Sequence, residues 1–345
     1  MSFKRLDPED ISISAESVIA PAWSSQVTTL STFFTSSVQP LSYQGDYYYN
    51  IYQADPQDQA GFTSTSASIQ FAIGYGNSLG SGSIPLNATI PGGSPSAINY
   101  GQYRTLINGD ENTNFTFGTV TPQSIYVISV NRSRYKEKLL PGSFNLKLTN
   151  GGTTLNLTDN SRSTTTVSYL DSGRVYDIVS GSDGVAYTGV NPSGFSLNSG
   201  SYGKFLPDIG TIVLNGAALS GSAANGGIAL SINQNSGVSS KTNLNQFYSA
   251  IKAGGSFKLQ SEETVSSNYV FVRVRNGEYN YSTNPSIISG SGELRFNVMV
   301  NTPQAYITTI GMYNDNNDLL AVAKLSKPLL KDFTKEALVR IKLDY

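Results

Sequence analysis

Short runs in which apolar and polar side chains alternate are the feature that most limits how this chain folds. In residues 67–73, Ile69, Phe71 and Ile73 occupy alternate positions, so they share one face of an extended strand. A period of two cannot form the apolar stripe of a helix, which requires a period of 3.6 residues. Runs of this kind recur along the chain and predict half-buried β-strands.

Turn-forming residues separate many of these runs. Asn150-Gly151-Gly152 joins β-favouring segments at residues 144–148 and 154–157, which predicts a hairpin because Asn and Gly accept positive φ. A second hairpin is predicted between residues 175–179 and 185–187, and the apolar run 124–130 is typical of a buried strand. Further strands are predicted at residues 47–52, 211–214, 228–232, 269–275, 293–300, 306–313, 319–325 and 337–345.

Two segments have helical spacing instead. Apolar residues of residues 244–251 follow i, i+3, i+4 and i+7, and Gly254 is placed to end the helix. Residues 98–107 predict a shorter helix, with Pro95 near its start and Gly109 at its end. The expected fold class is therefore mainly β: antiparallel sheets in a sandwich-like body, about two short helices, and long Gly/Ser/Asn-rich loops.

Composition divides the chain into parts. Residues 1–40 mix apolar and Ser/Thr residues without a helical period, and we expect them to form an N-terminal arm. This arm is too apolar for a free tail, and packing on its own body and packing on a neighbouring subunit both stay open. We expect residues 41–160 and 265–345 to form a β body, with residues 161–264 as an inserted or second β-rich domain.

Composition also excludes several kinds of chemistry. The 345 residues include no histidine and no cysteine, so disulfides, Cys/His zinc sites and Ser-His-Asp or Cys-His catalysis are impossible. A net charge of −1 argues against a broad phosphate-binding surface. No apolar run has the length of a membrane helix, and the N-terminus lacks the apolar stretch of a signal peptide. We expect no cofactor, no nucleic acid and no membrane among the partners.

Carboxylates are the remaining route to catalysis or metal binding. Glu262-Glu263 is the only adjacent glutamate pair, and on a strand its side chains point to opposite faces. The turn at residues 314–318 offers oxygen ligands, but it lacks the Gly and Glu positions of an EF-hand loop. We interpret it as a structural turn, we assign no catalytic, cofactor-binding or metal-binding residue, and we expect the protein not to be an enzyme.

A cluster of basic residues is the most distinctive charged feature. Only 14% of the residues are charged, yet four cations alternate with other residues between positions 132 and 138. On a strand they would form one face, either a solvated edge that deters strand pairing or a contact with an acidic partner. We list these cations with three aromatic residues of the arm as candidate partner-binding residues: Arg132, Arg134, Lys136, Lys138, Trp23, Phe33 and Phe34.

Three segments carry a resemblance to a known class of protein. They are residues 131–146, which begin Asn131-Arg132-Ser133-Arg134-Tyr135; residues 280–285, Asn-Tyr-Ser-Thr-Asn-Pro; and the C-terminal block at residues 306–328. Together they resemble virion structural proteins of contractile-tailed phages, especially phages of cyanobacteria and other marine bacteria. The similarity extends from about residue 3 to the end of the chain and is least marked over residues 190–260. The order of an aromatic strand, an alternating strand and Gly-Ser-Gly-Ser at residues 80–83 is loosely similar to baseplate wedge proteins.

The resemblance implies a non-enzymatic structural subunit of a tailed-phage virion, made and assembled in the host cytoplasm. We expect it in the tail or baseplate, bound to other virion proteins and to copies of itself. A neck or capsid-associated protein is one alternative. A carbohydrate-binding adhesin or tail-fibre module is another, because exposed Tyr and Asn side chains suit sugar binding. A glycan-degrading enzyme with two carboxylates is the third.

Overall fold

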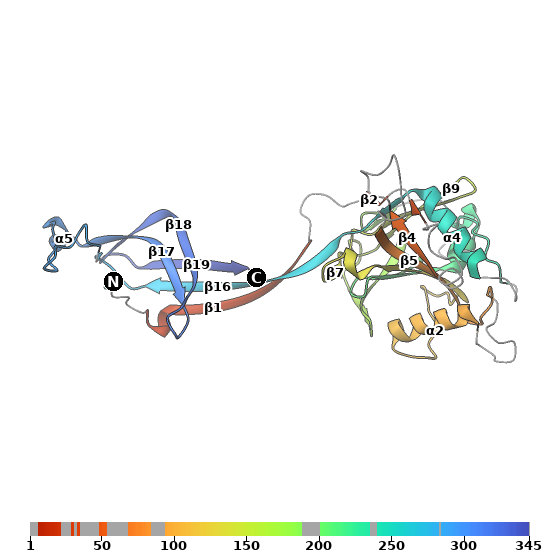
Figure 1. The fold of residues 1–345 in the computed structure, drawn as a ribbon, viewed down its shortest axis with the longest axis horizontal. Helices are drawn as coiled ribbons and strands as arrows, with labels where there is room; N and C mark the ends of the chain where they lie inside the picture. Colours follow the sequence, from red (N-terminus) through yellow and green to blue (C-terminus); the bar gives the residue numbers. More distant parts are fainter. Residues whose placement is uncertain are drawn as a thin grey trace. The chain divides into compact units, whose positions relative to one another are not determined.

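The fold of this computed structural model is mainly β, as the alternation predicts (Figure 1). The structure describes residues 6–21, 29–30, 33–34, 48–53, 68–83, 94–187, 201–234, 240–282 and 284–344. The chain forms two compact units. The large unit is Ala20–Glu263, and the small unit combines Met1–Ile19 with Thr264–Tyr345.

One antiparallel sheet makes up most of the large unit. In hydrogen-bonded order its strands are β2 (Thr29–Leu30), β15 (Ser256–Lys258), β8 (Asn145–Asn150), β9 (Thr153–Asp159), β11 (Gly173–Ser182), β13 (Gly203–Leu206), β14 (Thr211–Asn215), β6 (Ser124–Val130), β5 (Ser68–Asn77), β4 (Tyr48–Gln53) and β3 (Phe33–Phe34). The short strands β10 (Ser168–Leu170) and β12 (Val185–Ala186) pair with β11 beside this path. Both predicted hairpins are confirmed, as β8–β9 and as β11–β12.

The two ends of this sheet approach each other. β2 begins the path and β3 ends it, and Leu30 and Phe33 are three residues apart, so their Cα atoms lie within about 11 Å. The rings of Phe71 in β5 and Phe257 in β15, from opposite halves of the path, meet edge to face with centroids 5.0 Å apart. The sheet therefore curls nearly closed, which removes most of its exposed edge.

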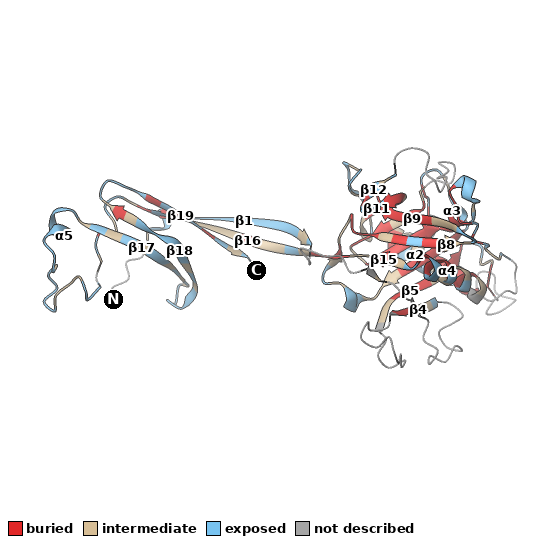
Figure 2. Ribbon diagram, turned by 90° about the horizontal axis from the view of Figure 1, so that it is seen from above, coloured by how far each residue is buried: buried red, intermediate tan, exposed pale blue. Residues whose placement is uncertain are grey.

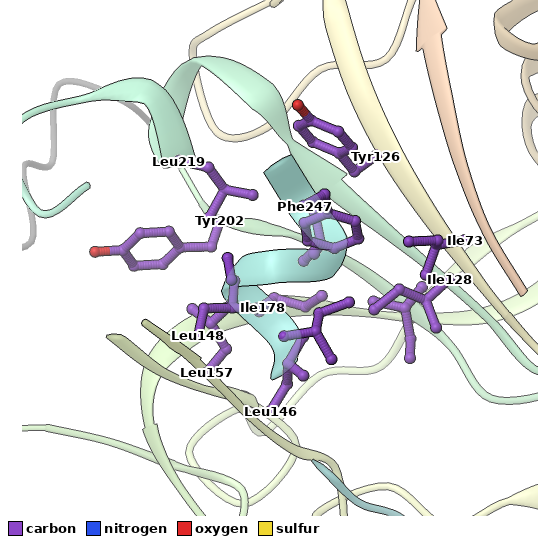
Figure 3. Close-up of a cluster of buried hydrophobic side chains, with 14 of the residues drawn as sticks. Ile73, Tyr126, Ile128, Leu146, Leu148, Leu157, Ile178, Tyr202, Leu219 and Phe247 are labelled. Carbon is purple, nitrogen blue, oxygen red and sulfur yellow. The ribbon is translucent and has the colours of Figure 1, made fainter. Parts of the chain in front are cut away.

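A hydrophobic core fills the inside of the curled sheet (Figure 3). Helix α4 (Ser240–Gly254) forms where it was predicted and packs against both β8 and β5. Its Phe247 stacks on Tyr126 of β6 with ring centroids 4.6 Å apart. Because α4 reaches strands far apart in the sheet order, its apolar face joins the two halves of the curl.

A second core covers the outer face of the same sheet. Helix α2 (Pro95–Asn108) begins after Ser94, whose side chain accepts a hydrogen bond from the Ala97 N–H, and ends at Gly109 with φ 67°. Residues of α2 pack with Ile125 and Val127 of β6, whereas Tyr126 and Ile128 of the same strand face the inner core. β6 is thus buried on both faces, which explains its unbroken apolar run.

The small unit consists of two sheets and a small core. One of its sheets contains β1 (Ile11–Pro21), β16 (Ser261–Val274) and β19 (Ala337–Asp344), and the other is the hairpin of β17 (Gln304–Tyr313) and β18 (Leu319–Asp332). The start of β16 still belongs to the large unit, where it pairs with β7 (Lys138–Leu139). The core of the small unit is formed by Val272, Val339 and Ile341, with partly buried residues such as Ile310 and Leu325 packed against it.

Two predicted strands are absent from the described residues. Residues 228–232 form a loop in which Ile228 and Leu230 are buried. The N–H groups of both residues donate to the carbonyl oxygen of Leu219, and Ala229 has φ 49°. Leu219 belongs to the short helix α3 (Gly216–Ser220). Residues 293–300 contain no strand, and their end begins the short helix α5 (Val298–Asn301). An alternating pattern indicates which side chains are buried. A strand also requires a partner strand to pair with, and the pattern does not show whether one is present.

The predicted domain division differs from the structure. β11, β13 and β14 lie between β9 and β6 in one sheet, so residues 161–263 belong to the same unit as residues 48–160. The change in composition beyond residue 160 does not coincide with a boundary between the two units. The boundary expected between residues 264 and 265 lies one residue from the boundary of the small unit, but residues 265–345 do not share a unit with residues 48–160 as predicted.

The described parts of the expected arm pair with the chain's own sheets. β1 pairs with β16, β2 pairs with β15, and β3 pairs with β4. The backbones of Phe33 and Phe34 lie opposite Gln53 and Tyr52. Trp23 lies outside the described residues.

Candidate interaction surfaces

The basic segment at residues 132–138 is not a strand, and the prediction of one basic face is wrong. The Asn131 side chain accepts a hydrogen bond from the Ser133 N–H and caps a 3-10 turn at Arg132–Arg134. Only Lys138 enters a strand, β7. A turn does not alternate its side chains, and the four cations contact different groups. The signal for this turn was Asn two residues before Ser, a spacing that favours Asx turns.

Most of these cations are bound within the large unit. Arg132 Nη1 donates to the carbonyl oxygen of Tyr135 at 2.7 Å, and its guanidinium lies over the Tyr135 ring. Arg134 Nε donates to the carbonyl oxygen of Ile69 at 3.0 Å. Lys136 forms an ion pair with Glu263. These contacts fix the segment to the sheet, and a contact with a partner protein stays a prediction.

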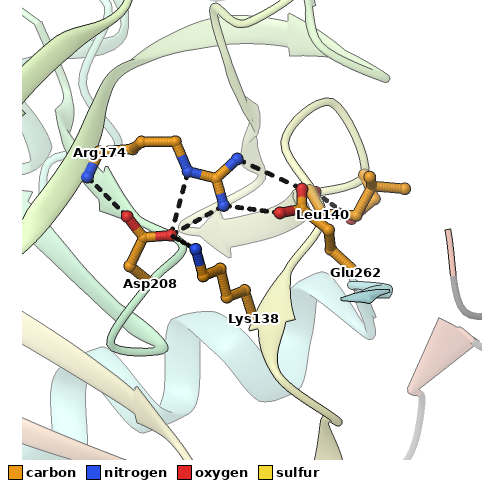
Figure 4. A network of polar contacts seen from close by, with 6 residues as sticks. Lys138, Leu140, Arg174, Asp208 and Glu262 are labelled. Atoms are coloured by element: carbon orange, nitrogen blue, oxygen red, sulfur yellow. Dashed lines mark hydrogen bonds and ion pairs between the residues drawn. The ribbon is translucent and has the colours of Figure 1, made fainter. Parts of the chain in front are cut away.

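Arg174 lies between two carboxylates in a largely buried network (Figure 4). Its Nη2 atom is 2.8 Å from Asp208 Oδ1 and 2.7 Å from Glu262 Oε1. Lys138 Nζ lies 3.6 Å from the same Asp208 oxygen. The Glu262 side chain is only 2% exposed, so this charge depends on Arg174 for its compensation.

The backbone at Gly173 allows this network to form. Gly173 has φ +107°, and a Cβ atom there would lie 2.4 Å from Asp208 Oδ2. That oxygen accepts the Arg174 backbone N–H at 2.7 Å. Burial by itself would raise the pKa of Asp208, but hydrogen bonds from Arg174 outweigh it and lower this pKa below its ordinary value. Likewise, burial alone would lower the pKa of Arg174, but its hydrogen bonds to Asp208 and Glu262 raise it.

The adjacent glutamates therefore have different environments. Glu262 binds Arg174, whereas Glu263 binds Lys136 and is partly exposed. Both carboxylates are held by cations, which is the arrangement of a structural ion-pair network. A glycosidase would need two carboxylates facing one cleft.

Two small cavities lie in the large unit. The first, of about 250 Å³, is lined by apolar residues such as Leu30, Phe71 and Phe257, with Arg134 at its polar side. The second, of about 220 Å³, is lined by polar residues that include Asn145, Lys147, Asn156, Tyr187 and Lys258. Neither of these two cavities is lined by a carboxylate among the described residues.

The acidic turn at residues 314–318 uses its side chains to hold its own backbone. The Asp318 N–H donates to Asn314 Oδ1 at 2.8 Å, and Asn314 Nδ2 donates to Asp318 Oδ2 at 2.9 Å. Asn317 has φ 64°. Both side chains therefore close the turn locally, as Asn and Asp often do in turns. In the described ranges, no three or more residues of the types His, Cys, Asp and Glu gather in a way that could hold a metal ion.

The small unit exposes many large apolar side chains. Figure 2 shows buried residues concentrated in the sheet of the large unit, whereas much of β17 and β18 is exposed. The exposed apolar residues of the small unit are Ile11, Ile13, Val18, Ile19, Tyr281, Phe296, Val298, Val300, Tyr306, Tyr313, Leu319, Leu320, Val322, Leu329, Phe333 and Leu338. Large exposed apolar surfaces mark interaction sites.

This apolar surface was not among the predicted site residues. A signal for it was present, because residues 319–323 are apolar at both odd and even positions. A strand with one solvated face would alternate instead.

Comparison with protein-family models, with curated proteins and with solved structures found no match to this chain. None of the helices in the described ranges has the length and apolar character needed to cross a membrane.

Proposed function

We propose that this chain is a non-enzymatic structural subunit of a tailed-phage virion, located in the tail or baseplate, that acts through contacts between subunits. Its assignment to a virion rests on the resemblance carried by residues 131–146, 280–285 and 306–328. Its action through contacts is supported by the apolar surface of the small unit.

The observation that carries the assembly role is the clustering of this surface on a hairpin. Tyr313 lies directly opposite Leu319 across β17 and β18, and their side chains are 46% and 53% exposed. Val322, on the same hairpin, is 56% exposed. Single exposed apolar residues are common on monomeric proteins, but contiguous groups of them mark contacts.

The large unit suits a rigid building block. Its sheet curls nearly closed around one core, and its buried carboxylates are held within the unit, Glu262 by Arg174 and Asp159 by the N–H groups of Gly142 and Ser161. A body of this kind keeps its shape while other surfaces bind neighbouring subunits.

Labelling of the particle tests this proposal. Antibodies raised against the chain and carrying gold should mark the distal end of the tail in electron micrographs of purified virions. Label at the neck or the head would replace the baseplate location with one of the alternative locations. Purified particles that lack the chain by mass spectrometry would contradict the proposal.

A second candidate function is carbohydrate binding, favoured by the polar cavity of the large unit. Its lining includes Tyr187, which is 45% exposed, and Asn156, whose Nδ2 lies 3.4 Å from the Tyr187 hydroxyl. An aromatic ring beside amide groups can stack on a sugar and hydrogen-bond to it. Binding on a glycan array that is lost in Tyr187→Ala would support this function, and an array without binding would count against it.

A further inference from the structure

We propose that the outer face of the β17–β18 hairpin binds the same face of a second copy of this chain, with the two hairpins antiparallel. We call this face the hairpin patch, and it consists of Tyr313, Leu319, Leu320 and Val322. The proposal names a partner for the proposed assembly role, and it rests on that role because it assumes that the hairpin binds another subunit.

The hairpin is apolar on both of its faces. On the inner face, Ile310, Met312, Ala323 and Leu325 pack against the core of the small unit. On the outer face, Leu320 is 68% exposed. Within the described residues of the small unit, only one apolar face of the hairpin is therefore covered.

Strand β6 of the large unit shows that a strand with apolar residues at consecutive positions can be covered on both faces. β6 is also apolar at consecutive positions, and it has one core inside the sheet and another outside it. β18 has the same kind of sequence at residues 319–323 but has a core on one side alone. Among the described residues of the small unit, no second core covers the other face of β18, and the proposal places a second copy of the chain there.

The hairpin patch is shaped for contact with another sheet. Gly311 lies opposite Val322, and a Cβ atom on Gly311 would be 2.9 Å from the Tyr313 ring and 3.4 Å from Leu319 Cδ1. The Tyr313 ring thus lies across the space above Gly311. Apolar side chains that lie over a sheet in this way can pack against a second sheet at the usual distance of about 10 Å.

The distribution of charges on the hairpin favours a second copy of this chain as the partner that binds the hairpin patch. Asp315 and Asp318 lie in the turn at one end of the patch, and Lys324, opposite Thr309, begins the basic part of β18 at the other end. Lys327 follows on the same strand, and β17 carries no charged residue. In a parallel arrangement of two hairpins, like charges would meet. An antiparallel arrangement about a two-fold axis places the acidic turn of each copy beside the lysines of the other.

The first experiment is sedimentation equilibrium of the full chain and of Val322→Asp. The wild-type chain should form dimers, and a charge placed in the centre of the contact should weaken dimerisation by at least about 100-fold. Leu320→Gln should weaken it in the same direction, and it replaces Val322→Asp if that variant fails to fold by circular dichroism. Lys252→Glu, an exposed residue of α4 in the large unit, is the control and should leave the dimer unchanged.

A charge exchange tests the antiparallel arrangement. Asp315→Lys and Lys324→Glu should each weaken self-association about three- to ten-fold, because each places like charges together. Mixed together, the two variants should restore a mixed dimer, since each then provides the charge that the other lacks. Asp318 is left unchanged because it holds the turn through Asn314.

Different results overturn different statements. A wild-type chain that stays monomeric, or a dimer that Val322→Asp leaves intact, would overturn the hairpin contact. The mixed variants failing to associate would overturn the antiparallel pairing of copies. None of these results bears on whether the chain is present in the virion, which the gold labelling decides separately.

Discussion

The two units bury their apolar residues to different extents. In the large unit, the inner and outer cores cover both faces of β6, and Tyr126 and Ile125 are fully buried. In the small unit, β18 is also apolar at consecutive positions over residues 319–323, yet Leu320 and Val322 are exposed. The comparison shows that strands of similar apolar character are covered on both faces in the large unit and on one face in the described part of the small unit. The described residues of the small unit form a small core and leave one face of the β17–β18 hairpin exposed, which agrees with the proposed role in assembly.

The largest effect is expected from a cavity in the large unit. Phe247→Ala removes a ring that stacks on Tyr126 in the inner core, and it should lower the free energy of unfolding by about 4 kcal/mol. Val322→Ala in the small unit should change the stability of the monomer by less than about 0.5 kcal/mol, because the side chain is already exposed. Both free energies of unfolding are measured by urea denaturation at a protein concentration low enough for the chain to be monomeric. Equal losses of unfolding free energy in the two variants would contradict the difference in burial between the large unit and the hairpin of the small unit.

A slightly smaller effect is expected from breaking the buried ion network. Arg174→Met leaves Glu262 buried without its cation and should cost about 3 kcal/mol in unfolding free energy. Lys136→Met removes the more exposed ion pair with Glu263 and should cost less than about 1 kcal/mol. Thermal or chemical denaturation compares the two variants. A stable Arg174→Met protein would show that the network is not needed for stability.

A core substitution in the small unit should reveal whether the units unfold independently. Ile341→Ala removes buried side-chain atoms from the small core and should cost about 2 kcal/mol, at the low end for such changes because few residues surround it. Hydrogen exchange followed by mass spectrometry should show lost protection in β16 and β19, with β6 and β14 unchanged. Loss of protection throughout the chain would mean that the two units unfold as one.

The smallest effect is a change of stability with pH at Asp208. Because its pKa is lowered in the folded protein, ionised Asp208 stabilises the fold above the ordinary Asp pKa of about 3.9. This contribution is lost as the pH falls through the lower pKa of the folded state. Asp208→Asn should therefore be less stable than wild type at pH 7, and the difference should narrow below about pH 4. A difference independent of pH would show that Asp208 does not act through its charge.

Much of the fold was predictable because local backbone chemistry determines it. The Gly151-Gly152 loop has φ values of 54° and 83°, and Asp183-Gly184 has 51° and 79°, so both hairpins follow from residues that accept positive φ. Helix α2 likewise begins at Pro95 and ends at Gly109. Closure of the sheet was not predictable, because it depends on β2 and β3 finding partners that are distant in the chain.

The sequence showed which candidate residues are charged, but it did not show which groups those charges contact. The spacing of Arg132, Arg134 and Lys136 suggested one basic face, whereas the cap at Asn131 turns the backbone there. The pairing of Arg174 with Asp208 and Glu262 joins residues from three separate segments, so no local pattern contains it.

The sequence by itself determined the secondary structure class, the main hairpins and helices, and the absence of histidine and cysteine chemistry, because these depend on neighbouring residues and on composition. The tertiary structure alone decided which apolar residues are covered. Leu320 and Ile128 are similar residues in similar strands, yet one is exposed and the other is buried, because burial depends on what packs against each face and not on the strand itself.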